Sequence, residues 1–209
     1  MSFTPPREVR NLRIALIAAP FIAVPPADYG GTELFVAHLA EGLRKSNIDV
    51  VVYANGESTV EAERRWLYEK TQWPIKTTDY AWLKELDHTA WAVADALKES
   101  DLIHAQSTQA LALSRFANRP FVLTLHGPHE SKLSEYFSHY QEVQYVAISE
   151  DQARQESLPK LRTIHHAPTQ ETRFLAEGKV AALAPTSAMI CCAESTPKPG
   201  TSPSRCTAS

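Results

Sequence analysis

The sequence predicts an α/β protein whose core is a doubly wound, mainly parallel sheet. Short runs rich in Val, Ile and Leu recur along the chain, and their continuous apolar character is typical of strands buried on both faces. Amphipathic helical patterns separate several of these runs. A strand–helix alternation of this kind favours parallel strands joined by right-handed crossovers.

Six runs are expected to form the strands, and they cover residues 13–18, 49–54, 101–105, 121–127, 145–149 and 161–167. Helices are predicted over residues 31–47, 81–100 and 149–158. The third helix is expected to begin at Ser149 as its N-cap, because acidic residues follow in the first turn.

Two details of the elements follow from the pattern. In the first helix, Leu34, Phe35, Leu39 and Leu43 recur at helical spacing, which predicts that they form the buried side. Segment 57–82 starts with charged residues and continues with aromatic ones, and we expect it to form loops and helices.

The chain is expected to divide into a domain over residues 1–174 and a tail over 175–209. The tail has no sustained period of 2 or 3.6 and is rich in Ser, Thr, Ala and Pro. Such a segment buries too little apolar surface to offset its ordering entropy, so disorder is predicted. The abrupt change also suggests a second hypothesis, in which these residues are read from a shifted frame of a longer gene.

Composition excludes several classes of protein. The net charge is -3 and no basic run interleaves with aromatic residues, which argues against a nucleic-acid partner. No apolar run is long enough to span a bilayer, and the first residues lack the apolar core of a signal peptide, so we expect a cytoplasmic protein. The cysteines, Cys191, Cys192 and Cys206, all lie in the tail and indicate neither a disulfide framework nor a zinc site.

The loop after the first strand carries the strongest functional signal. It runs from about Pro20 to Gly31, which exceeds the usual strand-to-helix length, and it ends in Gly30 and Gly31 at a helix N-terminus. Unpaired N–H groups and the helix dipole favour an anion there, and glycine lets a phosphate or sugar come close. The alternative is a plain turn with a glycine N-cap. Neither the dinucleotide fingerprint nor the P-loop motif is present, which disfavours a nicotinamide or ATP site.

Four stretches in order resemble the N-terminal half of family-4 glycosyltransferases. They are RIALIAAPFIAVPPADYGGTELFVAHLAEGLRKSNIDVVVYANGES, DLIHAQS, FVLTLHGP and YVAISED, and the resemblance covers about residues 12–174. It implies one Rossmann-like domain of the two-domain GT-B fold. It also implies transfer of a sugar from a nucleotide-sugar donor to an acceptor, with retention of configuration and without a metal or other cofactor.

In the family the N-terminal domain mostly binds the acceptor and lends its glycine loop to the donor phosphates. The second domain of the family holds the nucleotide with a basic pair and a Glu-x7-Glu signature, and the sequence shows no counterpart of that second half. We therefore expect the chain to be inactive alone and to self-associate through an exposed interdomain face. The rival hypothesis is a non-catalytic α/β module that binds a sugar or an anion at Gly30 and Gly31.

His126 is the predicted catalytic residue, since the resemblance implies that it hydrogen-bonds the donor sugar near the reacting centre. It ends a strand, where ligands of such sheets bind, and Gly127 beside it is expected to face the same ligand. The alternative for His126 is a hydrogen bond to a loop carbonyl. His104 also ends a strand and is expected to line the cleft.

Glu33 and Ser149 are assigned to the donor or acceptor as well, each with a structural alternative. Glu33 lies in the first helical turn, where it could complement the dipole, and Ser149 could serve only as a cap. His165 and His166 point to opposite faces of a strand, so no metal site is expected from them. The tryptophans (Trp66, Trp73, Trp82, Trp91) are expected to pack in the core, with an acceptor platform as the alternative.

Overall fold

The computed structural model describes residues 11–76 and 80–165, and these form a parallel sheet with flanking helices. The strands are β1 (Arg13–Ile17), β2 (Asp49–Ala54), β3 (Glu63–Trp66), β4 (Leu102–Ala105), β5 (Phe121–Leu125), β6 (Gln144–Ala147) and β7 (Leu161–Thr163). The helices are α1 (Gly31–Lys45), α2 (Ala81–Ala96), α3 (Ala110–Ser114), α4 (Ser131–Ser138) and α5 (Glu150–Gln155). The predicted fold class is confirmed.

The strand order is β3-β2-β1-β4-β5-β6-β7, and every neighbouring pair is parallel. The chain adds strands on one side of β1 as far as β3 and then crosses to β4 on the other side. The order therefore reverses between β1 and β4. In open α/β sheets, ligands bind beyond the carboxyl ends of the strands at such a reversal.

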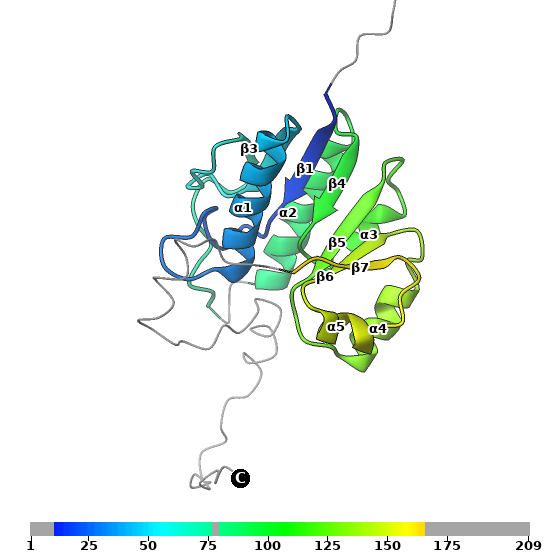
Figure 1. Cartoon of the computed structure of the whole chain (residues 1–209). Coiled ribbons are helices and arrows are strands. Elements are labelled where there is room, and N and C mark those ends of the chain that lie inside the picture. Colours follow the sequence, from blue (N-terminus) through cyan, green and yellow to red (C-terminus); the bar gives the residue numbers. More distant parts are fainter. Residues whose placement is uncertain (1–10, 77–79, 166–209) are drawn as a thin grey trace, which may run out of the picture.

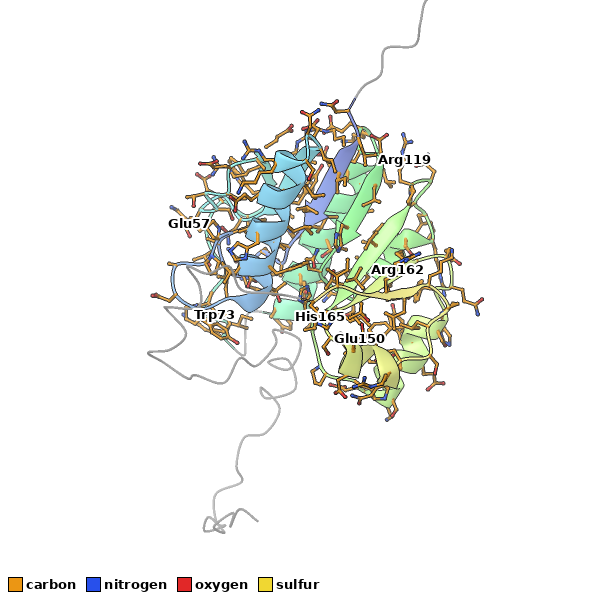
Figure 2. All side chains as sticks on the ribbon, in the orientation of Figure 1. Glu57, Trp73, Arg119, Glu150, Arg162 and His165 are labelled. Atoms are coloured by element: carbon orange, nitrogen blue, oxygen red, sulfur yellow. The ribbon has the colours of Figure 1, made fainter. Side chains whose placement is uncertain are left out.

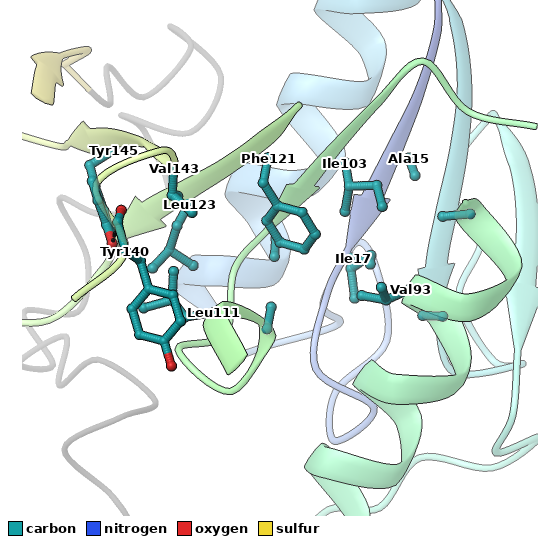
Figure 3. Close-up of a cluster of buried hydrophobic side chains, with 14 of the residues drawn as sticks. Ala15, Ile17, Val93, Ile103, Leu111, Phe121, Leu123, Tyr140, Val143 and Tyr145 are labelled. Atoms are coloured by element: carbon teal, nitrogen blue, oxygen red, sulfur yellow. Dashed lines mark hydrogen bonds between the residues drawn. The ribbon is translucent and has the colours of Figure 1, made fainter. Parts of the chain in front are cut away.

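Two apolar clusters hold the helices against the sheet. On one face α1 packs over β1 and β2, with Leu16, Val36, Ala40 and Val52 among the buried residues. The other face carries α2, α3 and α4, and Figure 1 shows α1 in front of the sheet with α2 and α3 behind it. Figure 3 shows the cluster on that second face, which includes Ile17, Ile103, Leu111, Phe121, Leu123 and Tyr145.

A charged cluster closes the amino edge of the sheet around β1. The Arg13 side chain forms ion pairs with Asp49, Glu63 and Glu99; the Nη2 atom lies 2.6 Å from Glu63 and 3.2 Å from Glu99. Asp49 and Glu63 are the first residues of β2 and β3. One guanidinium therefore ties together the starts of three adjacent strands.

All six predicted strands are present, but segment 57–82 was assigned wrongly in part, because it contains β3. This strand, ERRW, pairs only with β2 at the edge of the sheet and is mostly exposed. Charged residues are common on edge strands because they oppose pairing with another chain. An edge strand of this kind lacks the apolar run by which the other strands were recognised.

The buried side of α1 also differs from the prediction. It consists of Thr32, Glu33, Val36 and Ala40, whereas Phe35, Leu39 and Leu43 are only partly buried. The predicted tail, its cysteines and the boundary at residue 174 lie outside the described residues and stay predictions.

Candidate functional site

A pocket of about 630 Å³ opens at the carboxyl edge of the sheet, beside the reversal between β1 and β4. Its wall comes from the loops after β1, β4 and β5, from the first turns of α1 and α2, and from α4 and α5. In Figure 2, Trp73 and Glu150 mark this edge of the molecule, and Arg119 lies at the opposite one. The pocket thus occupies the position where α/β sheets of this topology bind ligands.

His126 lies on the pocket wall, immediately after β5. Its Nε2 atom is 2.7 Å from Oε1 of Gln106, and its ring meets that of Phe35 edge-on, with centroids 5.3 Å apart. A carbonyl oxygen only accepts, so this contact places the proton on Nε2. The ring is therefore fixed from two sides while it remains partly exposed to the pocket.

Gln152 of α5 holds the loop that carries His126. Its Nε2 atom donates to the carbonyls of Leu125 (3.0 Å) and Gly127 (2.6 Å), and its Oε1 accepts from the N–H of Ile148 (2.8 Å). Gln152 is buried and thus links the ends of β5 and β6. It fixes the backbone on both sides of the histidine. Gly127 itself lines the pocket.

His104 takes a different position from His126. Its Nε2 atom is 2.8 Å from Oγ1 of Thr124, and its ring centroid is 6.5 Å from that of Phe35. It lies on the sheet face that α1 covers and is not part of the pocket lining, although Thr124 is. The expected role of His104 in ligand binding stays a prediction.

Gly30 and Gly31 differ sharply in their surroundings. Gly30 has a φ of 152°, and a Cβ atom there would lie 2.8 Å from Oε2 of Glu33 and 2.9 Å from Cβ of Pro26. A Cβ atom on Gly31 would meet no atom within 4 Å among the described residues. Close packing thus requires glycine at position 30, whereas Gly31 begins α1 next to open space.

The loop that carries these glycines is anchored to the segment between β2 and β3. The N–H of Val24 donates to the Ser58 hydroxyl at 3.0 Å, and its carbonyl accepts from Thr59 and Val60 at 2.8 and 3.0 Å. Val24 is fully buried. The loop is therefore a packed part of the domain, and it presents the N-terminus of α1 in a defined position.

Glu33 lies inside the fold beneath Gly30. Its side chain has no exposed surface, and neither carboxyl oxygen has a hydrogen-bond partner among the described residues. Burial raises the pKa of Glu33 to about 7; its own backbone N–H opposes this shift, and the charge of Glu85 adds to it. Glu33 does not line the pocket, and its predicted contact with a ligand stays a prediction.

Ser149 caps α5, as one of its two sequence interpretations expected. The hydroxyl accepts from the N–H of Gln152 at 3.1 Å, and Glu150 and Asp151 occupy the first turn. Ser149 does not line the pocket. A contact with donor or acceptor stays a prediction for this residue.

The floor of the pocket carries a polar cluster after β4. Glu85 of α2 accepts a hydrogen bond from Nε2 of Gln109 at 3.1 Å. Burial raises the pKa of Glu85, and a hydrogen bond from the Ser107 hydroxyl opposes that shift. Two buried amide atoms, Nε2 of Gln106 and Oε1 of Gln109, have no hydrogen-bond partner within the described part of the chain.

A Ser–His–Glu cluster at the pocket wall has the wrong geometry for a catalytic triad. Nδ1 of His129 is 2.9 Å from Oε1 of Glu156 and 3.1 Å from the Ser134 hydroxyl, which in turn donates to Oε2 of Glu156 at 2.6 Å. In a triad the serine and the carboxylate contact different ring nitrogens. Here both contact Nδ1, so the cluster joins α4 to α5 and does not activate a nucleophile.

The sequence alone did not predict three glutamines of the site, Gln106, Gln109 and Gln152. Gln106 and Gln109 follow the end of β4 closely, so the strand-end rule that selected His126 would also have selected them. Gln152 lies three residues after a cap, and no sequence pattern distinguishes it from a solvent-exposed helical glutamine.

Across residues 11–76 and 80–165, no group of three or more His, Cys, Asp or Glu side chains is placed to hold a metal ion. No helix in those residues is long and apolar enough to cross a membrane.

Comparison with known families assigns the chain. The model of Glycosyltransferase Family 4 matches residues 29–192, which is more than half of the sequence. The chain belongs to glycosyltransferase family 4. The match begins just before Gly30 and continues past residue 174, so it does not settle the predicted domain boundary.

Two solved structures share the fold of this family-4 domain. HepE from Anabaena, crystallised with UDP and glucose, aligns with a TM-score of 0.50 and 17% identity, over 80% of this chain and 50% of that one. A sucrose-phosphate synthase structure from Thermosynechococcus elongatus aligns with a TM-score of 0.51 and 16% identity, over 79% of this chain and 95% of that one. The chain thus spans about half the length of the HepE chain. None of the curated proteins matches the sequence.

Proposed function

We propose that this domain forms the acceptor side of a retaining, metal-independent glycosyltransferase that uses a nucleotide-sugar donor. The observation that carries the proposal is the pocket at the carboxyl edge of the sheet, which His126 and the first turn of α1 both border. A group that hydrogen-bonds a sugar and a helix end that favours a phosphate are thus adjacent. These are the two contacts that a nucleotide-sugar requires.

His126 is the proposed catalytic residue. Its Nε2 atom lies 2.7 Å from Oε1 of Gln106, and this contact holds the ring at the pocket wall, where it can meet a sugar hydroxyl. The edge-on contact with Phe35 and the bonds from Gln152 to the loop restrict the movement of the ring. Such positioning promotes transfer by holding the sugar in place while charge develops on the leaving phosphate.

Gly31 is the proposed point of approach for the donor phosphates. It begins a helix of 15 residues, and the space where its side chain would lie is open. Gly30 contributes indirectly, because only a glycine at this position permits the loop to pack over Glu33.

The described residues provide only one wall of such a site, and we propose that a second domain holds the nucleotide. On that basis the 209-residue chain has little transfer activity alone and can self-associate through the uncovered edge. A cytoplasmic location is proposed on composition alone.

The proposal is tested by calorimetry and by a transfer assay on the 209-residue chain. UDP-glucose is a suitable first probe, because HepE bound UDP and glucose. We expect weak binding that is lost in His126→Ala and retained in His139→Ala, an exposed histidine outside the pocket. Binding of glucose or inorganic phosphate equal to that of UDP-glucose would instead favour a non-catalytic binding module. Robust turnover of radiolabelled nucleotide-sugars by this chain would contradict the proposal that a second domain is needed to complete the site.

A further inference from the structure

The rim of the pocket is unusually aromatic for a surface exposed to water. Trp73, Ile75, Tyr80 and Trp82 all line it; Tyr80 is 65% exposed and Trp82 54% exposed. Large rings that remain in water leave an apolar patch uncovered, and such patches mark binding sites. Tyr80 is also one of two non-glycine residues in the described chain with a positive φ, 47°, a left-handed backbone conformation that is unfavourable for a residue with a side chain.

The floor of the pocket presents a complementary set of polar atoms. The orphaned Nε2 of Gln106 is a donor and the orphaned Oε1 of Gln109 is an acceptor; both atoms are closed to solvent, so a ligand in the pocket reaches them only when the two side chains turn. A hydroxyl group both donates and accepts, so it can satisfy either atom. A phosphate or carboxylate can only accept, and it would leave Gln109 without a partner.

The charge of the lining also discriminates between ligands. Three carboxyl groups border the pocket, those of Glu85, Glu130 and Glu156, whereas Lys76 is the one cationic side chain among the described lining residues. Glu156 is already engaged by His129 and Ser134. When Glu85 is ionised, an anionic ligand meets like charge at the floor, which is energetically unfavourable at short range.

We propose that the acceptor is a neutral glycoside, whose hydroxyls reach Gln106 and Gln109 while an apolar aglycone packs on Trp73, Tyr80 and Trp82. This inference rests on the proposed function, since it names the acceptor class of that site. Both halves of the ligand follow from the lining: the hydroxyls satisfy the orphaned amides, and the apolar part covers the exposed rings. A phosphorylated sugar keeps its hydroxyls, but it lacks the apolar part and adds a negative charge beside the carboxyl groups of the lining.

Equilibrium binding to the 209-residue chain, without a donor, tests the inference separately from transfer. The probes are glucose, galactose and mannose, each compared with its phenyl glycoside and its 6-phosphate. Ligand-observed NMR at pH 8 measures the binding of each probe. For at least one of the three sugars, we expect the phenyl glycoside to bind about three- to tenfold more tightly than the free sugar, since an aromatic pair contributes about 0.5–1.5 kcal/mol. The 6-phosphate should bind more weakly than the free sugar.

Two variants locate the effect. Trp82→Ala should remove most of the advantage of the phenyl glycoside, whereas Phe116→Ala, in the loop before β5 and 83% exposed, should leave it unchanged. Glu85→Gln should reduce the difference in affinity between the free sugar and its 6-phosphate. The inference is overturned if the sugar 6-phosphates bind as tightly as the free sugars or more tightly. It is also overturned if no phenyl glycoside binds more tightly than its free sugar. If UDP-glucose still binds through His126 in that case, the proposed function stands and only the acceptor class is wrong.

Discussion

Replacement of Glu33 by Gln should make the protein more stable at neutral and alkaline pH. Glu33 is fully buried, and its two carboxyl oxygens have no hydrogen-bond partner in the described structure. Gln has nearly the same shape and cannot ionise. The variant therefore differs from the wild type chiefly by the free energy of placing a charge inside the fold.

The magnitude follows from the pKa of Glu33, which burial raises from 4.5 to about 7. Below pH 4.5 the group is protonated in both the folded and the unfolded chain, and ionisation costs nothing. Between pH 4.5 and 7 the unfolded chain releases its proton first, so the folded state loses stability as the pH rises. Above pH 7 the full cost is present, about 3 kcal/mol at 1.36 kcal/mol per pH unit.

Urea unfolding of the two proteins at pH 5 and pH 8 measures this difference. We expect Glu33→Gln to equal the wild type within about 1 kcal/mol at pH 5 and to exceed it by about 3 kcal/mol at pH 8. His88 is buried, and burial lowers its pKa to about 4, which gives the opposite trend. This contribution is common to both proteins and cancels in the comparison.

The matched control is Glu41→Gln, on the exposed side of the same helix, where the carboxylate pairs with Lys45. It should show no gain in stability at pH 8. An equal stability difference between Glu33→Gln and the wild type at both pH values would contradict the buried ionisation, because a buried carboxyl that titrates near pH 7 must produce a pH dependence.

Four further substitutions test the glycine loop, the support of His126 and the ion pairs of Arg13. Gly30→Ala should destabilise the fold by about 2 kcal/mol in urea unfolding, because its Cβ has no room. Gly31→Ala should change the stability by no more than about 0.5 kcal/mol, but it should weaken UDP-glucose binding in calorimetry. Gln152→Leu should cost about 2–3 kcal/mol, because three backbone partners lose their hydrogen bonds, and faster amide exchange in the loop after β5 would identify the cause. Arg13→Met should cost about 1–2 kcal/mol at pH 7 and progressively less below pH 4, where its carboxylate partners become protonated; a pH-independent loss would contradict the role of the ion pairs.

The sequence predicted the buried strands because each of them is apolar on both faces. The strands on either side of the reversal, β1 and β4, therefore followed directly from the pattern, and so did the position of His126 at the end of β5. β3 was missed because its sequence, ERRW, contains no apolar run, although it pairs with β2 at the edge of the sheet. Helix α1 was found, but its buried side was placed one residue away, on Phe35 in place of Val36.

The site was predictable only where a residue type and a strand end coincide. His126 and Gly127 met that condition, and both line the pocket. Glu33 was interpreted as a first-turn acid that complements the helix dipole or contacts a ligand. The sequence revealed the long loop before it, but not that this loop packs over the Glu33 side chain. The support that Gln152 gives to His126 depends on the contact between α5 and the ends of β5 and β6, which only the tertiary structure establishes.

The place of β1 in the sheet bears on how the protein folds during synthesis. β1 leaves the ribosome before the other strands of the described chain, yet it lies between β2 and β4, and the backbone N–H of Arg13 bonds to Asp101, 88 residues later. Until residue 105 has emerged, β1 has an unpaired edge and half of its apolar neighbours are missing. Contacts of such long range slow folding and leave strand edges exposed to aggregation. A translation pause or chaperone binding while the residues between β2 and β4 are being synthesised would therefore affect the yield of this domain more than one after β5 has been synthesised.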